Sequence, residues 1–206
     1  MVWVDGRLVR IEIATDITER KVIEQELAAA KALAERQANT DELTQLYNRR
    51  AFFALSRHLF HQAHRAGQTL AVVMFDLDHF KRINDQWNHA AGDAVLVKIA
   101  ALARNILRGS DVLARIGGEE FAILLPDTDE AAAWHLVERL RAGFEHGTTK
   151  DEIQCTASFG ISHANLKDFP SELEPENLLG SLLHQADVAM MQAKAEGRNR
   201  VCVFGK

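Results

Sequence analysis

The sequence predicts an α+β domain in which helices cover a mixed β-sheet. Apolar runs typical of strands occupy residues 69–75, 112–116, 121–125, 153–162 and 201–204. The predicted order is helix, strand, two helices, hairpin, helix, strand, helix, strand, which fits helices layered on one sheet. With 206 residues, of which 47% are apolar and 26% charged, the chain can form one sizeable core plus an appendage.

The first 39 residues have the pattern of that appendage. Residues 2–13 alternate around Asp5-Gly6 as in a β-hairpin, which is marginally stable alone and indicates the end of something larger. A charged helix is expected from Asp16 or Thr18 to about Asn39. A stripe of residues repeats about every 3.5 positions along it. This repeat fits a short coiled coil, and it fits equally well a single helix packed on the next domain. The positions that repeat are Ile23, Leu27, Ala30, Ala34 and Gln37.

Capping residues mark the helices of the main domain. Asparagine and aspartate cap helix starts, and glycine often follows helix ends. These signals predict helices from Asn48 to His64 with a stop at Gly67, over 79–86, over 91–108 with a stop at Gly109, from Asp129 to about His146, and from Pro175 to Glu196 with a stop at Gly197.

The segment Gly117-Gly118-Glu119-Glu120-Phe121 places two carboxylates directly after a double glycine. Gly-Gly between two strand-like runs predicts a tight hairpin, because glycine adopts positive φ without steric cost and lets a ligand approach the backbone. Two acids at such a turn repel each other unless a cation is bound there. An acidic hairpin tip can also be simply a solvated turn.

Strand direction suggests how these acids meet two others, Asp76 and Asp78. A strand, helices and a second strand of one sheet nearly always form a right-handed parallel crossover, so 69–75 and 112–116 should run the same way. If these strands are neighbours, Asp76 and Glu119 are candidates to hold one divalent cation, with Asp78 and Glu120 close by. Magnesium suits such oxygen ligands and binds through one or two carboxylates plus substrate phosphates.

Groups that a nucleotide needs surround these acids in the sequence. Lys81, Lys194 and Arg198 can each supply positive charge to phosphates. Asp93 can accept hydrogen bonds from adjacent ring and amino donors, and Asn84 can both donate and accept, which suits guanine. Taken singly, the two lysines could be surface residues and Arg198 could serve only the end of its helix.

Composition excludes several classes of protein. The net charge of −5 argues against a broad nucleic-acid surface. Cys155 and Cys202 have no zinc-type spacing and are expected to be buried, reduced thiols of a cytoplasmic protein. No apolar run approaches the ~18 residues that span a bilayer, so no membrane contact is expected within these residues.

Over roughly residues 39 to 206 the chain resembles a GGDEF-domain diguanylate cyclase. The resemblance is carried by segments in a fixed order. They are Asp41-Glu42-Leu43-Thr44 with Asn48-Arg49-Arg50, Phe75-Asp76-Leu77-Asp78-His79-Phe80-Lys81, Asn84-Asp85 with His89 and Gly92-Asp93, Arg115-Ile116-Gly117-Gly118-Glu119-Glu120-Phe121, Ser158-Phe159-Gly160-Ile161, and Ala186-Asp187 leading to Ala193-Lys194 and Gly197-Arg198-Asn199.

This resemblance implies a palm-like nucleotidyl cyclase fold with a ferredoxin-like core, and the condensation of two GTP into cyclic di-GMP and two pyrophosphates. It implies Mg²⁺, or Mn²⁺ in its place, bound by Asp76, the Leu77 carbonyl and Glu119. Glu119 would also be the base for the ribose 3′-hydroxyl, and Glu120 would support the metal site. The remaining implied substrate contacts are Lys81, Lys194 and Arg198 with phosphate, Asn84 and Asp93 with guanine, and His89, Gly117 and Gly118 elsewhere in the site.

The resemblance also implies regulation. Because each domain binds one GTP, ring closure needs a homodimer. Arg108-Gly109-Ser110-Asp111 fits the family's RxxD inhibitory site for the product, which Arg139 would complete, although R-x-x-D can also be a helix-end salt bridge. Residues 1–18 resemble the end of a PAS-type sensor domain, 19–39 form a signalling linker and 40–206 the catalytic domain. The alternative function is an inactive module that binds GTP or cyclic di-GMP.

Three positions depart from the family pattern. Asn88 and Gln45 stand where glycine is usual, and Met191 replaces a frequent tyrosine. Asparagine tolerates positive φ better than most residues, so Asn88 should disturb its turn only mildly. None of the proposed metal or guanine residues is lost.

Overall fold

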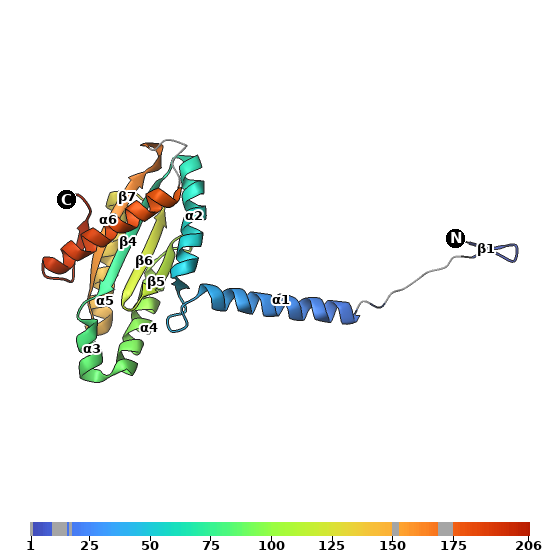
Figure 1. Ribbon diagram of the computed structural model, residues 1–206, viewed down its shortest axis with the longest axis horizontal. Coiled ribbons are helices and arrows are strands. Elements are labelled where there is room, and N and C mark those ends of the chain that lie inside the picture. The colour runs from blue at the N-terminus through green and yellow to red at the C-terminus, as the bar shows by residue number, and fades with distance from the viewer. Residues whose placement is uncertain (1, 10–15, 17, 150–152, 169–174) are drawn as a thin grey trace. The chain divides into compact units, whose positions relative to one another are not determined.

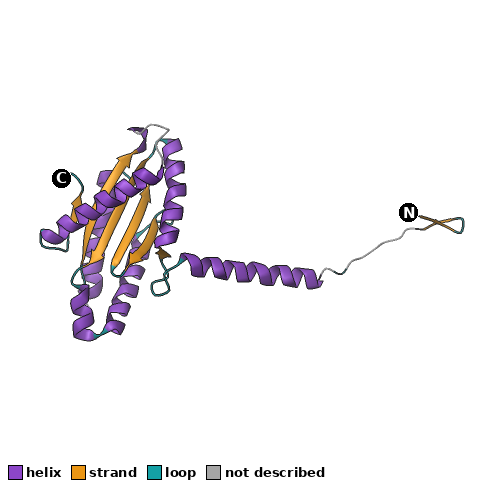
Figure 2. Cartoon of the chain, viewed as in Figure 1, coloured by secondary structure: helices purple, strands orange, loops and turns teal. Residues whose placement is uncertain are grey.

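The computed structural model describes residues 2–9, 16, 18–149, 153–168 and 175–206 (Figures 1 and 2). The chain divides into two compact units, Met1–Ala38 and Asn39–Lys206, and each is described by itself. None of the helices in the described ranges is long and apolar enough to cross a bilayer.

The first unit contains a hairpin and a helix. Strands β1 (Val2–Val4) and β2 (Arg7–Val9) pair antiparallel, and Asp5 and Gly6 turn between them with φ of 48° and 73°. Positive φ at both central residues matches the twist of a two-residue hairpin. The predicted apolar positions Ile11 and Ile13 lie outside the described residues.

Helix α1 (Thr18–Asn39) follows, with Asp16 accepting a hydrogen bond from the Thr18 N–H at 2.9 Å. None of its residues is buried. The side chains of Ile23 and Leu27, two positions of the predicted stripe, are 56% and 69% exposed.

The second unit is built on a six-stranded mixed sheet with the order β3-β5-β6-β4-β7-β8 (Figure 1). The central strand β4 pairs antiparallel with β6 and β7, whereas the outer pairs β3–β5 and β7–β8 are parallel. The strands are β3 (Tyr47–Asn48), β4 (Thr69–Leu77), β5 (Val112–Gly117), β6 (Glu120–Pro126), β7 (Ala157–Asn165) and β8 (Val201–Val203).

Helices cover both faces of this sheet (Figure 2). Alternate side chains of β4 divide the core: Val73 and Phe75 pack in one cluster with α3, α4 and α5, and Val72 and Met74 in another with α2 and α6. By this alternation Asp76 belongs to the face covered by α2 and α6. The helices are α2 (Arg49–Ala66), α3 (Phe80–Trp87), α4 (His89–Ile106), α5 (Glu130–Thr149) and α6 (Pro175–Ala195), with a 3₁₀ turn at Leu166–Asp168.

A group of phenylalanines in ring contact fixes the register of the central strands. Phe75 pairs with Phe121 on β6 and with Phe159 on β7, with ring centroids 4.8 Å and 5.1 Å away. Phe144 of α5 closes the group at 5.5 Å from Phe75. Since a one-residue slip would turn these rings out of the core, the residue after Phe75 has a fixed position opposite Glu120.

The structure both confirms and corrects the strand arrangement expected from sequence. β4 and β5 are each antiparallel to β6, so they run in the same direction, as predicted. They are not neighbours, because the hairpin folds β6 back between them. The mixed sheet flanked by helices is confirmed.

Two of the differences between predicted and observed element ends have a clear local cause. The helix expected to reach residue 108 ends at Ile106, where the Leu107 N–H caps it by donating to Ala103. The strand expected from residue 153 begins only at Ala157, because the last turn of α5 holds Cys155. The Cys155 N–H donates to the Thr148 hydroxyl at 3.1 Å, and the Cys155 carbonyl accepts from the same hydroxyl at 2.9 Å.

Candidate active site

The carboxylates predicted to act together lie at one edge of the sheet, where β4 ends and β6 begins. Asp76 is the register partner of Glu120. The Leu77 N–H donates to the Glu119 carbonyl at 3.4 Å, which places the hairpin tip beside the end of β4. The strand that carries Asp76 therefore lies directly beside the hairpin that carries the two glutamates, although β4 and β5 are not neighbours.

The double glycine forms the predicted hairpin turn. Gly118 has φ of 48°, in the left-handed region that favours glycine. A Cβ atom added to Gly117 or Gly118 would meet no other atom within 4 Å, so both glycines border open space. Arg115 holds the turn: its Nε donates to the Gly118 carbonyl at 2.8 Å, and its guanidinium forms an ion pair with Asp41 at 3.1 Å.

Asp76 is a nearly buried carboxylate in a crowded electrostatic environment. It is 7% exposed, and Lys194 Nζ lies 2.9 Å from its Oδ1. Burial raises the pKa of Asp76, the ion pair with Lys194 opposes that rise, and the charges of Glu119 and Glu120 add to it. Because burial and the two glutamates disfavour the ionised form of Asp76, a bound cation would stabilise this edge.

The donors fit a cation that the substrate helps to hold. Among the described residues, no group of three or more His, Cys, Asp or Glu side chains is arranged to enclose a metal. Magnesium needs only one or two carboxylates when phosphates complete its coordination, so Asp76, Glu119 and a backbone carbonyl are a sufficient set. The neighbouring Cys155 is a poor ligand, since burial, with Asp78 and Asp76, raises its thiol pKa to about 12.

Lys194 reaches Asp76 because α6 lies unusually close to the sheet. A Cβ atom on Gly160 of β7 would be only 2.0 Å from the Ala186 carbonyl oxygen and 2.2 Å from the Met190 nitrogen. Only glycine permits this approach. The glycine of the Ser158-Phe159-Gly160-Ile161 motif therefore sets the distance between the lysine and the acidic edge.

The side chain of Asn84, on α3, lies against the first turns of α4, one residue before Asp93. A Cβ atom on Gly92 would lie 2.0 Å from Asn84 Oδ1, so the Asn84 amide rests against the residue preceding Asp93. Asn88 shapes the intervening turn with φ of 98°, and its side chain accepts from the Ala91 N–H at 3.1 Å. Asparagine therefore performs here both the conformational role of glycine and that of a helix cap.

Three other predicted site residues are exposed. Lys81 lies in the first turn of α3, His89 is the first residue of α4, and Arg198 lies in the turn after α6. Within the described ranges, no hydrogen bond or ion pair joins their side chains to Asp76.

Asp78 differs from the other acids because it anchors the structure. This role was not predicted from the sequence. It accepts hydrogen bonds from the Thr156 and Ser158 hydroxyls, each at 2.7 Å, and from the Asn199 N–H at 3.0 Å. It therefore ties the end of β4 to β7 and to the turn after α6. The alternation of the strand before Asp78 cannot reveal these partners, which lie 78 to 121 positions away.

The predicted inhibitory residues share a second site. The Arg108 N–H donates to Asp111 Oδ2 at 2.8 Å, and Arg139 of α5 donates to the Ile106 carbonyl at 3.1 Å. A cavity of about 240 Å³ is lined by all three predicted residues. The full lining is Arg108, Asp111, Thr128, Ala132, His135, Leu136 and Arg139.

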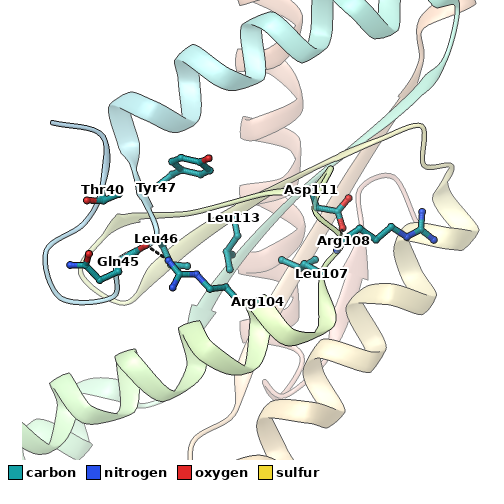
Figure 3. A pocket seen from close by; sticks show the side chains of 9 residues that line it. All are labelled: Thr40, Gln45, Leu46, Tyr47, Arg104, Leu107, Arg108, Asp111 and Leu113. Carbon is teal, nitrogen blue, oxygen red and sulfur yellow. Dashed lines mark hydrogen bonds between the residues drawn. The ribbon is translucent and has the colours of Figure 1, made fainter. Parts of the chain in front are cut away.

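A second cavity of about 340 Å³ also has Arg108 and Asp111 in its lining. Its opposite end is formed by Thr40, Gln45 and Tyr47, from the segment that precedes α2 (Figure 3). Arg104 reaches from α4 to donate a hydrogen bond to the Gln45 carbonyl (Figure 3). Gln45 has φ of 56°, which accounts for the glycine usual at this position.

Comparison with known proteins places this arrangement in a family. The model of the diguanylate cyclase GGDEF domain matches residues 38–200. The chain belongs to the GGDEF-domain family. The palm-like fold expected from the motifs is shown by GGDEF-domain structures. One of them is the coiled coil and GGDEF domain of DgcB from Caulobacter crescentus in complex with c-di-GMP. It superposes with a TM-score of 0.79 at 27% identity, and the match covers 91% of this chain and 96% of that one.

A relative and a solved structure from Vibrio cholerae are also similar to this GGDEF domain. A diguanylate cyclase is 35% identical over 195 residues, which is 94% of this chain and 56% of its relative. The active GGEEF domain of a diguanylate cyclase superposes with a TM-score of 0.68 at 32% identity, covering 77% of this chain and 97% of that one. The chain spans about half the length of the curated relatives it matches, 46% and 56% for the first two.

Proposed function

We propose that this chain is a diguanylate cyclase that condenses two GTP molecules into cyclic di-GMP and two pyrophosphates. The observation that carries the proposal is the acidic edge, where Asp76 lies opposite Glu120 on the neighbouring strand with Lys194 at 2.9 Å. Relatives named diguanylate cyclases and a GGDEF-domain neighbour in complex with c-di-GMP support it.

Asp76, the Leu77 carbonyl and Glu119 would hold a divalent cation, Mg²⁺ or Mn²⁺, with support from Glu120. When bound, the cation neutralises charge on the triphosphate. Lys194 is paired with Asp76 at 2.9 Å and would turn to phosphate when nucleotide arrives. The remaining phosphate contacts would come from Lys81, Arg198 and the open backbone at Gly117 and Gly118.

The chemical step joins the 3′-oxygen of one GTP to the α-phosphorus of the other. Glu119 would accept the proton of the 3′-hydroxyl, the new P–O bond would form, and the bond to the departing pyrophosphate would break. Two such steps close the ring. Since each domain holds one GTP, a homodimer would bring the two nucleotides face to face, and α1 (Thr18–Asn39) is a means of arranging it.

Guanine would be recognised by Asn84 and Asp93, with His89 nearby at the start of α4. Contact between the Asn84 amide and the Gly92 backbone supports this assignment, because it fixes the amide next to Asp93. Product feedback would act through Arg108, Asp111 and Arg139, which line one cavity. Residues 1–18 would be the end of a PAS-type sensor domain, and 19–39 the linker that passes its signal on.

Incubation of the purified protein with GTP and Mg²⁺, followed by chromatography of the products, tests the proposal. Cyclic di-GMP and pyrophosphate are expected, and added cyclic di-GMP should slow their formation. The Glu119→Gln variant should form neither product while keeping its fold by circular dichroism. Nucleotide binding without any turnover by the wild type would favour the alternative, a regulatory GTP-binding module.

A further inference from the structure

The turn after α6 adopts an unfavourable backbone conformation. Gly197, Arg198 and Asn199 all have positive φ, at 119°, 65° and 44°, and two of these residues carry side chains. The left-handed region is uncommon for such residues and persists where surrounding contacts hold it. The Arg198 N–H donates to the Ala193 carbonyl at 3.0 Å, closing the end of the helix.

Asn199 is held on both its backbone and its side chain. Its N–H donates to Asp78 Oδ2 at 3.0 Å, and Asp78 is itself 5% exposed. Its amide oxygen accepts from Arg141 NH1 at 3.0 Å, and its amide nitrogen donates to Glu145 Oε1 at 3.1 Å. Both partners of the side chain belong to α5.

The partners of Asn199 are themselves fixed. Arg141 forms ion pairs with Glu138 at 2.9 Å and with Glu145 at 3.0 Å. The hydrogen bond to Glu138 has the larger effect, and together the two carboxylates raise the pKa of Arg141. Asp78 is anchored by Thr156 and Ser158. Asn199 therefore joins two rigid groups, one on the sheet and one on α5.

We propose that Asp78 and Asn199 are positioning residues for phosphate binding: they hold the turn so that the exposed Arg198 side chain faces the triphosphate. Arg198 itself closes α6 through its N–H, and it directly precedes Asn199, the residue that is held. Holding an arginine in place before the ligand arrives reduces the entropy lost on binding. The identity of the ligand rests on the proposed function, whereas the positioning is a property of the turn.

The experiment is a double-mutant cycle on the affinity for a non-reactive GTP analogue with Mg²⁺, measured by calorimetry. Asn199→Ala keeps the backbone bond to Asp78 but removes both side-chain bonds, and Asp78→Asn weakens the backbone anchor. Each should raise the Kd, and the KM for GTP, about tenfold, as loss of a charge-assisted phosphate contact does. In an Arg198→Ala background, the same changes should alter the Kd less than twofold.

Glu138→Gln is the matched control, since a glutamine can still accept the hydrogen bond from Arg141, and among the described contacts Glu138 is not bonded to Asn199. This variant should leave the Kd within twofold of wild type. An equal loss of affinity with and without Arg198 would overturn the proposal, and so would unchanged affinity in Asn199→Ala. If no cyclic di-GMP forms but the cycle behaves as expected, the positioning stands and the cyclase assignment fails.

Discussion

Asp76 and Asp78 are two residues apart and almost equally buried, at 7% and 5% exposure, yet their surroundings differ in kind. Burial raises the pKa of Asp76, and charges surround it: Lys194 at 2.9 Å opposes that rise, and two glutamates add to it. Asp78 receives three hydrogen bonds from hydroxyls and a backbone N–H.

The difference shows how burial alone fails to identify a functional acid. A carboxylate whose acceptor positions are used by neutral donors is already satisfied and serves the structure. A carboxylate that lies near other acids and is paired with a lysine can exchange that lysine for a ligand and its metal. Substitutions at these two acids and their supports should therefore separate activity from stability.

The largest effect is expected from Asp76→Asn. Loss of the predicted metal ligand should lower turnover about 10³-fold, the scale of losing a key electrostatic contact in a transition state. The free energy of unfolding should change by no more than about 1 kcal/mol, since removing a buried charge relieves desolvation while the ion pair with Lys194 is lost. Turnover assays and urea unfolding check the two expectations.

Gly160→Ala should disturb the ion pair between Asp76 and Lys194 indirectly, by displacing α6. Its Cβ would meet helix backbone at 2.0 Å, which cannot move aside as a side chain can. Displacement of α6 should destabilise the protein by about 3 kcal/mol and separate Lys194 from Asp76. Gly180→Ala is the control, because a Cβ there meets no atom within 4 Å, and it should leave stability unchanged or slightly raised.

Gly92→Ala should weaken the recognition of GTP without a large loss of stability. The added Cβ would meet the end of the Asn84 side chain at 2.0 Å, and that side chain can rotate away. The KM for GTP should rise about tenfold through the lost guanine contact, with a small change in melting temperature. A fall in stability as large as that of Gly160→Ala would contradict the assignment of Asn84.

The smallest effect on activity is expected from Thr156→Val, which removes one donor from Asp78 with little change in shape. The lost bond should cost about 1 to 2 kcal/mol of stability. For a domain of this size the melting temperature should fall by about 4 °C. Turnover at saturating GTP should stay within about twofold of wild type, as a thermal melt and a parallel assay would show.

Local patterns predicted much of this structure. The Asn48 cap, the Gly67 stop and the Gly-Gly hairpin depend on a few adjacent residues, and each is present: Ala51 N–H donates to Asn48 Oδ1 at 3.0 Å, and Gly67 has φ of 57°. The common direction of β4 and β5 followed from crossover handedness.

Sequence could not predict what depends on distant partners. The return of β6 between β4 and β5 arises from sheet pairing rather than from local signals. The role of Asp78 depends on Asn199, 121 positions later, and the place of Asn84 depends on the missing Cβ of Gly92. Gln45 and Asn88, which looked like departures from the glycine pattern, keep the positive φ that glycine would have.

The most direct test measures Mn²⁺ binding by electron paramagnetic resonance in the presence of a saturating, non-reactive GTP analogue. Wild type, Asp76→Asn and Asp78→Asn are compared. Wild type and Asp78→Asn should immobilise the ion with the nucleotide, and Asp76→Asn should not. Equal binding by Asp76→Asn, or its loss in Asp78→Asn alone, would contradict the account.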